Sequence, residues 1–216
     1  MLTEDAESSS PAVTKSVTGG YDAVQTDIVP QGSKAFSLGH VSHEDSDQTI
    51  TLNNSVSPSS ETNLYFESKL GWASSTQVAH VDASTDGGSN WSSIWSKAGT
   101  NNAGDGMFSL QTVDLSSFEG ISIFLRFRFS YSGGTYYPKT SSGIGWYFDN
   151  IQVGDSFSTR EWSIGSPTAE EQLVIALLNR ARSDSQAELQ LLINTTDSDT
   201  VDQYNAWDVN FTALAN

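Results

Sequence analysis

Two stretches in the middle of the chain show the clearest hydrophobic patterns. From residue 121 to 131, apolar side chains occupy every second position (Ile121, Ile123, Leu125, Phe127, Phe129 and Tyr131), and Ser122, Arg126, Arg128 and Ser130 form the opposite face, with Phe124 the single exception. A period of two is typical of a half-buried β-strand. A second run, Ile144–Val153, is nearly continuous in large apolar residues but is interrupted by Asp149 and Asn150. The two runs predict the central strands of a β-sandwich.

Shorter apolar runs precede these two stretches. They are Tyr21–Ile28, Ala35–Leu38, Gln48–Leu52, Asn63–Ser68, Gln77–Ala83, Ser92–Trp95 and Phe108–Leu115, with Val13 and Val17 as weaker strand candidates. Turn-forming clusters separate them, and no helical period occurs before residue 167. About ten short strands at this spacing predict a mainly β fold, an antiparallel jelly-roll sandwich.

The pattern changes after residue 154. We predict a jelly-roll sandwich over residues 1–155, a linker over 156–167 and a helical segment over 168–216. Thr168 and Glu171 form a capping box, and one helical face carries Leu173, Val174, Leu177, Leu178 and Ala181. A second helix is expected around Gln186–Ile193 and an acidic loop over Thr195–Asp202. Such short helices cannot bury their own apolar faces, so we expect residues 168–216 to begin a domain that continues beyond residue 216.

The charge narrows the range of partners. The chain has 10 Lys and Arg against 26 Asp and Glu, a formal net charge of -16, which disfavours nucleic acid and anionic membranes. The absence of cysteine removes disulfides, thiol nucleophiles and Cys-based metal sites. No run approaches the roughly 18 apolar residues of a membrane span, and the first residues lack the pattern of a signal peptide.

The segment Ser84–Trp91 resembles the Asp-box of sialidase-type propellers. Asp86 is placed to bind turn amides, Gly88 permits positive φ, and Trp91 is expected to close over the hairpin. The motif repeats from blade to blade in propellers but occurs once here. We therefore interpret Asp86, Gly88 and Trp91 as a structural turn and not as a glycosidase site.

The three histidines suggest no catalytic centre. His40 and His43 lie in a polar stretch that lacks the helical frame of a zinc site, so we expect a surface loop. His80 alternates with Val78 and Asp82, which predicts the exposed face of a strand. No nucleophile elbow, P-loop or dinucleotide fingerprint occurs in a suitable context, and we assign no catalytic residue.

Asp149 is the residue that packing explains least. A carboxylate among large apolar side chains needs backbone amides, Arg126 or Arg128, or a cation. Calcium binds several oxygen ligands, and Glu4, Asp5 and Glu7 would supply them if the two ends of the domain meet. Asp5, Glu7 and Asp149 are therefore the candidate calcium ligands.

Tyr136 and Tyr137 are the candidate ligand-binding residues. They lie in a loop of Gly, Ser and Thr between the two central strands. Their rings are suited to stacking on sugars, and they are equally suited to closing one end of the sandwich.

Several motifs together resemble the MAM-like jelly-roll modules of secreted bacterial proteins. The motifs are Val81-Asp-Ala-Ser-Thr-Asp-Gly-Gly-Ser-Asn-Trp, Val113-Asp-Leu-Ser-Ser-Phe-Glu-Gly, Leu125-Arg-Phe and Gly145-Trp-Tyr-Phe-Asp-Asn-Ile. Such modules accompany immune-inhibitor-A-type metallopeptidases and choice-of-anchor surface proteins. The resemblance covers about residues 1–155 and matches Glu7 to an acidic residue of the first strand. It implies that Asp149 lies near a calcium site.

A second resemblance begins at Glu170. The stretch through Glu188 is similar to the opening helix of bacterial CAP (SCP-like) extracellular domains. Asn179, Arg180, Ala181, Arg182 and Glu188 match, whereas Ser185 replaces the usual proline. The cavity residues of that family lie further on and have no counterpart in this chain, so no CAP activity is assigned.

Both resemblances imply an extracellular or cell-surface protein. We predict a non-catalytic binding or adhesion module of an exported bacterial multidomain protein, with a glycan or a cell-surface protein as partner. The alternative is a structural spacer that positions a downstream CAP-like domain. A glycosidase-related enzyme is a third reading, which rests only on the single Asp-box.

Overall fold

The computed structural model describes residues 2–157, 190 and 194–206, and the chain divides into two compact units, Met1–Ser158 and Thr159–Asn216. The strands of the first unit are β1 (Leu2–Glu4), β2 (Val13–Ser16), β3 (Val24–Gln25), β4 (Ala35–Leu38), β5 (Ser46–Leu52), β6 (Asn63–Leu70), β7 (Gln77–Ser84), β8 (Ser92–Ala98), β9 (Ser109–Asp114), β10 (Phe124–Tyr131) and β11 (Trp146–Gly154). A 3-10 turn, Ser116–Phe118, lies between β9 and β10.

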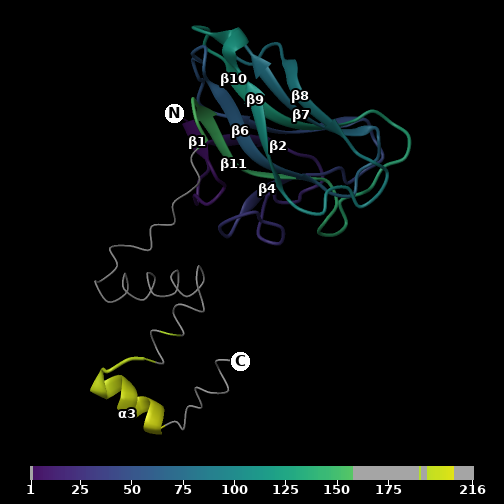
Figure 1. The fold of residues 1–216 in the computed structure, drawn as a ribbon. Coiled ribbons are helices and arrows are strands. Elements are labelled where there is room, and N and C mark those ends of the chain that lie inside the picture. Colours follow the sequence, from purple (N-terminus) through teal and green to yellow (C-terminus); the bar gives the residue numbers. More distant parts are fainter. Residues whose placement is uncertain (1, 158–189, 191–193, 207–216) are drawn as a thin grey trace. The chain divides into compact units, whose positions relative to one another are not determined.

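Two antiparallel sheets form a β-sandwich, as predicted (Figure 1). Sheet A has the order β3-β4-β11-β6-β9, with β1 also paired to β11, and sheet B has the order β2-β5-β10-β7-β8. The two strongest hydrophobic runs of the sequence are therefore β10 and β11, each the middle strand of its sheet. They do not pair with each other, because they face one another across the core.

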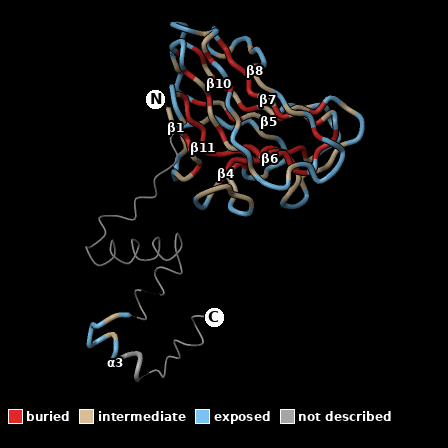
Figure 2. Tube along the Cα trace, in the orientation of Figure 1, coloured by how far each residue is buried: buried red, intermediate tan, exposed pale blue. Residues whose placement is uncertain are grey.

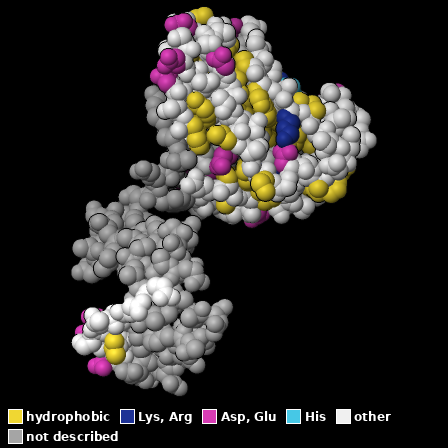
Figure 3. All heavy atoms as spheres, in the orientation of Figure 1, with side chains coloured by type: hydrophobic (Ala, Val, Ile, Leu, Met, Phe, Trp, Pro, Cys, Tyr) yellow, Lys and Arg dark blue, Asp and Glu magenta, His cyan; other side chains and the backbone are white. Residues whose placement is uncertain are grey.

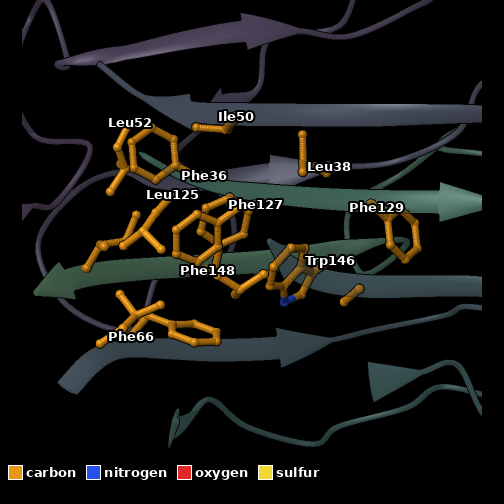
Figure 4. Close-up of a cluster of buried hydrophobic side chains, with 14 of the residues drawn as sticks. Phe36, Leu38, Ile50, Leu52, Phe66, Leu125, Phe127, Phe129, Trp146 and Phe148 are labelled. Carbon is orange, nitrogen blue, oxygen red and sulfur yellow. The ribbon is translucent and has the colours of Figure 1, made fainter. Parts of the chain in front are cut away.

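Aromatic side chains of the two central strands make that contact. Phe127 of β10 stacks on Phe148 of β11, with ring centroids 4.5 Å apart and an interplanar angle of 8° (Figure 4). Trp146 packs beside them and donates a hydrogen bond from Nε1 to Ser68 Oγ at 2.9 Å. The strands are buried along this seam and the connecting loops are exposed (Figure 2). The alternating apolar residues of the sequence are thus the residues that form the core.

The N-terminal strand β1, which the hydrophobic pattern did not predict, adds to sheet A. It pairs with the last part of β11, Leu2 opposite Val153 and Glu4 opposite Ile151. The first part of β11, residues 146–148, pairs on the same edge with β4. Residues 149 and 150 lie between the two partners, where the register of β11 with β6 also shifts.

Some predicted strand boundaries were wrong. The run from Tyr21 to Ile28 contains only the two-residue strand β3. Ile121 was expected in the core but is 45% exposed, because β10 begins at Phe124 after the 3-10 turn.

The second unit contains helix α3, Ser198–Ala206, where we expected an acidic loop over Thr195–Asp202. The Oδ1 atom of Asp197 accepts a hydrogen bond from the backbone N–H of Thr200 at 2.8 Å, the geometry of an N-cap that starts a helix. The helices predicted over 168–182 and 186–193 fall outside the described residues, apart from Gln190. In the described part of the chain, no helix has the length and apolarity needed to cross a membrane.

Candidate metal centre and binding surfaces

Asp149 lies on the outer face of sheet A, in the gap between β4 and β1. Its neighbour Phe148 points into the core, so the Asp149 side chain points the other way, beside its cross-strand partner Glu67. Asn150 has a φ of 50°, in the left-handed region, which asparagine adopts more readily than most other residues with a side chain. This conformation accompanies the shift of register between β11 and β6.

The Asp149 carboxylate is fully buried and poorly satisfied. Neither Oδ1 nor Oδ2 has a hydrogen-bond partner among the described residues. Burial raises the pKa of Asp149 to about 8; the nearby Asn150 amide opposes that rise, and the negative charges of Asp5, Glu7 and Glu67 add to it. Deprotonation at this position would place a negative charge among other negative charges, so the site favours either a proton or a cation.

Arg126 and Arg128, one of the three alternatives considered as partners of Asp149, bind another residue. Both bind Asp82 of β7, at 2.8 Å from Arg126 Nη2 and 2.7 Å from Arg128 Nε. They belong to β10, whose polar face points outward from sheet B, whereas Asp149 is on the outer face of sheet A. This removes the arginine alternative, which the sequence left open because it does not say which sheet a strand joins.

The two candidate calcium ligands from the N-terminus come close to Asp149, as the charge effects on its pKa indicate. The Glu7 carboxylate, however, already accepts hydrogen bonds from the Ser33 amide at 2.7 Å, the Ser33 hydroxyl at 2.7 Å and the Lys34 amide at 2.9 Å. Gly32 lies so close that a Cβ there would be 2.2 Å from Glu7 Oε1. Glu7 therefore fastens the loop that covers this region. Asp5 Oδ1 accepts a hydrogen bond from the Glu7 amide at 3.2 Å.

Glu67 belongs to the same cluster and was missed by the sequence reasoning. Its Oε2 accepts a hydrogen bond from Asn150 Nδ2 at 2.6 Å. The alternation of β6 predicts that Glu67 points away from the core. Only the register between β6 and β11 places it beside Asp149.

Carboxylate oxygens are ligands that a hard cation such as calcium prefers. Among the described residues, however, no group of three or more His, Asp or Glu side chains is placed to hold a metal ion. Any calcium at Asp149 would therefore need backbone carbonyl oxygens and water to complete its coordination.

The loop between the central strands separates the two candidate tyrosines. Tyr137 lies against Trp72, with ring centroids 5.3 Å apart, and Trp72 is 40% exposed. Gln77 holds Tyr137 in place by accepting from its amide at 2.8 Å and donating to its carbonyl at 3.1 Å. Tyr136 instead packs against His43 and Tyr131, at 5.0 and 5.5 Å. We call Trp72 and Tyr137 the aromatic platform.

Trp72 was also missed. It follows β6 in a segment held by isolated bridges to the loops around residues 102 and 144, which has no periodic signature in the sequence.

The histidines play structural parts. His40 was predicted to lie in a surface loop but is buried, with Nε2 3.2 Å from the Ser46 carbonyl oxygen and Nδ1 3.2 Å from Gln77 Nε2. Burial lowers its pKa. His43 is exposed and contacts the Gly134 carbonyl oxygen at 2.9 Å. His80 projects from the outer face of β7, within 3.1 Å of two serine hydroxyls.

The hairpin from Ser84 to Trp91 is built by side-chain hydrogen bonds to its own turn. Asp86 Oδ1 accepts from the Asn90 amide at 2.8 Å, and Trp91 Nε1 donates to the Gly88 carbonyl at 2.9 Å. Gly88 has a φ of 92°. Hydrogen bonds from Asn90 hold the pKa of Asp86 at about 2. The aspartate is thus occupied by the turn.

No family model matches the chain, and no curated protein matches it. Among solved structures, the chain is similar to the K2 adhesin domain of Lys-gingipain, with a TM-score of 0.50 and 16% identity over 71% of this chain and 97% of that one. The K1 adhesin domain of Lys-gingipain from Porphyromonas gingivalis W83 gives a TM-score of 0.50 and 14% identity, covering 72% and 98%. A family 22 xylan-binding domain gives 0.47 and 9%, covering 73% and 96%.

Identities this low show the fold alone. The mainly β sandwich is confirmed. The resemblances to MAM-like modules and to the start of a CAP domain stay predictions.

Proposed function

We propose that residues 2–157 form a non-catalytic binding module that acts outside the cell or at its surface, on a glycan or a cell-surface protein. The observation that carries this proposal is the aromatic platform, where the exposed Trp72 lies against Tyr137. Large rings that remain exposed on fixed loops are typical contact residues of binding proteins. The shared fold with adhesin domains supports a module of this kind.

The platform is suited to its task because it is already ordered. Tyr137 is held through both backbone polar groups by the buried Gln77, and its hydroxyl donates to the Asn101 carbonyl at 2.8 Å. A rigid ring loses little conformational entropy when a ligand stacks on it. Trp72 presents a flat apolar surface to a sugar ring or to an apolar side chain.

The test compares the wild-type chain with Trp72→Ala/Tyr137→Ala on a glycan array and on intact cells. We expect the double variant to lose at least about tenfold in affinity, since each buried aromatic contact contributes on the order of 1 kcal/mol or more. Tyr137→Phe is the matched control, because it keeps the ring and removes only the hydroxyl. No binding by either protein would favour the spacer function. Equal binding by both would show that the ligand contacts another surface of the module and would overturn the platform.

We also propose that calcium binds at Asp149. Asp149, Asp5 and Glu67 would hold the ion together with backbone carbonyl oxygens, and Glu7 would keep the covering loop in place. The support is the buried Asp149 carboxylate without hydrogen-bond donors, whose neighbours are also acidic. A divalent cation would offset these negative charges and tie the segment after β1 to β11.

Thermal unfolding tests the calcium proposal directly. At a calcium concentration about a hundredfold above Kd, we expect Tm to be higher than in EDTA by roughly 5 to 10 °C. The Asp149→Asn variant should show no such rise, and magnesium should act more weakly because it demands a stricter geometry. An unchanged Tm in the wild type would show that the site holds a proton and no metal.

A further inference from the structure

Two adjoining hollows lie over the outer face of sheet A. The larger, of about 510 Å³, is lined by residues 27–30 together with Glu67, Lys69, Met107 and Phe108. The smaller, of about 250 Å³, is lined by Gln25, Asp27, Lys139, Ser141, Ser142 and Tyr147.

The two hollows are neighbours. Asp27 lines both of them, and Tyr147 of β11, which lines the smaller one, is the cross-strand partner of Lys69 of β6, which lines the larger one. We call the two hollows together the sheet A groove.

Lys139 contributes an ammonium group without a counter-ion to this groove. The ion pairs among the described residues do not include it. Its Nζ donates to Ser37 Oγ at 2.5 Å and to Tyr147 Oη and the Ile144 carbonyl, both at 3.3 Å. Burial lowers the pKa of Lys139 to about 8, against the opposing effect of Asp27. These three hydrogen bonds use all three N–H donors of the ammonium, so Lys139 holds Tyr147 and its own loop in place beside the groove.

The groove contains charges of both signs. Each hollow contains one lysine and the shared Asp27, and the larger hollow also contains Glu67. The four side chains sum to zero formal charge, so the groove has no strong net attraction for a charged polymer. Lysine and carboxylate groups match hydroxyl groups well, because a hydroxyl both donates and accepts.

The larger hollow has apolar lining residues on two loops. Met107, which is 78% exposed, and Phe108 are on one of them, and residues 28–30 (Ile, Val and Pro) are on the other. An apolar surface next to a few converging polar groups is the usual composition of a ligand site. Figure 3 shows how hydrophobic side chains lie in patches among polar ones on one face of the molecule.

A peptide could not bind in this groove by adding a strand. The strands beneath it, β4, β11 and β6, each have a paired neighbour on both sides. Their backbone groups are therefore used within the sheet, and the ligand meets side chains only.

We propose that the sheet A groove is a second binding site, which takes a neutral oligosaccharide chain. This inference rests on the proposed binding function and names a ligand class and a site separate from the aromatic platform. The sugar hydroxyls would bond to Asp27 and Lys69, and a C–H face of a sugar ring would pack on Met107 and Phe108.

The experiment is titration calorimetry of residues 1–216 with β-1,4-linked gluco-, manno- and xylohexaose as neutral probes and polygalacturonate as an acidic one. The test variant is Asp27→Ala/Lys69→Ala, whose side chains are not buried, and Trp72→Ala/Tyr137→Ala is the matched control. Circular dichroism and Tm must agree with the wild type in both. We expect the groove variant to bind a neutral hexasaccharide at least about tenfold more weakly, and the platform variant to retain that binding.

The alternative outcomes separate the two proposals. Loss of binding in the platform variant only would overturn the groove and leave the proposed function standing. Tighter binding of polygalacturonate than of any neutral chain would overturn the ligand class. If the wild type binds none of the probes yet still binds cells through Trp72 and Tyr137, the groove is wrong and the binding function remains.

Discussion

The two sheets differ in how the buried carboxylate on the outer face is neutralised. On sheet B, Asp82 is only 1% exposed and accepts hydrogen bonds from Arg126 and Arg128. Burial alone would raise the pKa of Asp82, but those hydrogen bonds outweigh it and the pKa is lowered. On sheet A, Asp149 is equally buried, accepts no hydrogen bond within the described part of the chain, and has a raised pKa.

Lys139 extends the contrast. It lies in the loop over the outer face of sheet A, with its ammonium bonded to neutral oxygens and without an ion-pair partner among the described residues. Sheet B thus pairs its buried charge, whereas the outer face of sheet A holds charges of both signs that form no ion pair within the described part of the chain. The comparison suggests why the two proposed ligands, a cation and a hydroxyl-bearing chain, both belong to sheet A.

The largest expected loss of stability follows from removing Asp82, the carboxylate that pairs with two arginines on sheet B. Asp82→Ala would leave two guanidinium groups adjacent with no shared acceptor, and we expect a loss of about 4 kcal/mol in the free energy of unfolding. Urea denaturation at pH 7 measures it. The matched control is Asp47→Ala, since Asp47 is an exposed carboxylate 3.4 Å from Arg128 and should cost less than about 1 kcal/mol. Similar losses in the two variants would remove the contrast between the sheets.

The next effect is the pH dependence of Asp149 in EDTA. Its pKa is about 8 in the folded protein against 3.8 for a free aspartate, so the folded state binds more protons between these values and stability falls as pH rises. We expect the Asp149 contribution to fall by about 3 kcal/mol between pH 5 and 7, at about 1.4 kcal/mol per pH unit. The difference between wild type and Asp149→Asn isolates it. Asp149→Asn should therefore be the more stable protein at pH 8 without calcium.

A contribution of opposite sign is expected from Lys139. Its pKa is lowered from 10.5 to about 8, so the unfolded state binds more protons in that window and stability rises with pH. The Lys139 contribution should rise by about 2 kcal/mol between pH 8.5 and 10. Denaturation of wild type and Lys139→Met across this range measures it. Parallel pH curves for the two proteins would show that Lys139 is compensated after all.

The smallest effect concerns how sheet B orients its arginines. The Arg126 guanidinium carbon lies 4.3 Å from the centre of the Trp91 ring. Arg126→Lys should cost about 1 kcal/mol, because lysine loses the planar stacking and the paired hydrogen bonds to Asp82. A double-mutant cycle with Trp91→Ala separates the ring contact from the ion pair. Additive losses in the cycle would show no coupling between the ring and the arginine.

The sandwich was predictable because alternating apolar and polar residues show which face of a strand is buried. The period-two pattern of residues 121–131 placed Phe127 and Phe129 in the core, where they lie. The same pattern could not say that this strand and the strand of Asp149 join different sheets. Because β10 lies beside β7 in sheet B, its arginines neutralise Asp82 and not Asp149.

The site depends on register and on loop contacts, which leave little trace in composition. Glu67 reads as an ordinary outward residue of its strand, and only its pairing opposite Asp149 gives it a role. His40 looks exposed in a polar stretch, yet Ser46 and Gln77 satisfy both ring nitrogens beneath the loop. Trp72 and Tyr137 are far apart in the chain and meet through the packing of two loops.

The pairing of β1 with β11 has a mechanical consequence. Leu2 lies opposite Val153, so the start of β1 and the end of β11 leave the sheet at the same end. A force that pulls these two ends apart acts perpendicular to the strands. It would therefore break the hydrogen bonds of the pair one at a time, whereas a force along the strands would load all of them at once. The opening would reach the turn that carries Asp5 and Glu7 after only three residue pairs. The strength of the interaction between that turn and Asp149 would then set the force at which the module begins to unfold.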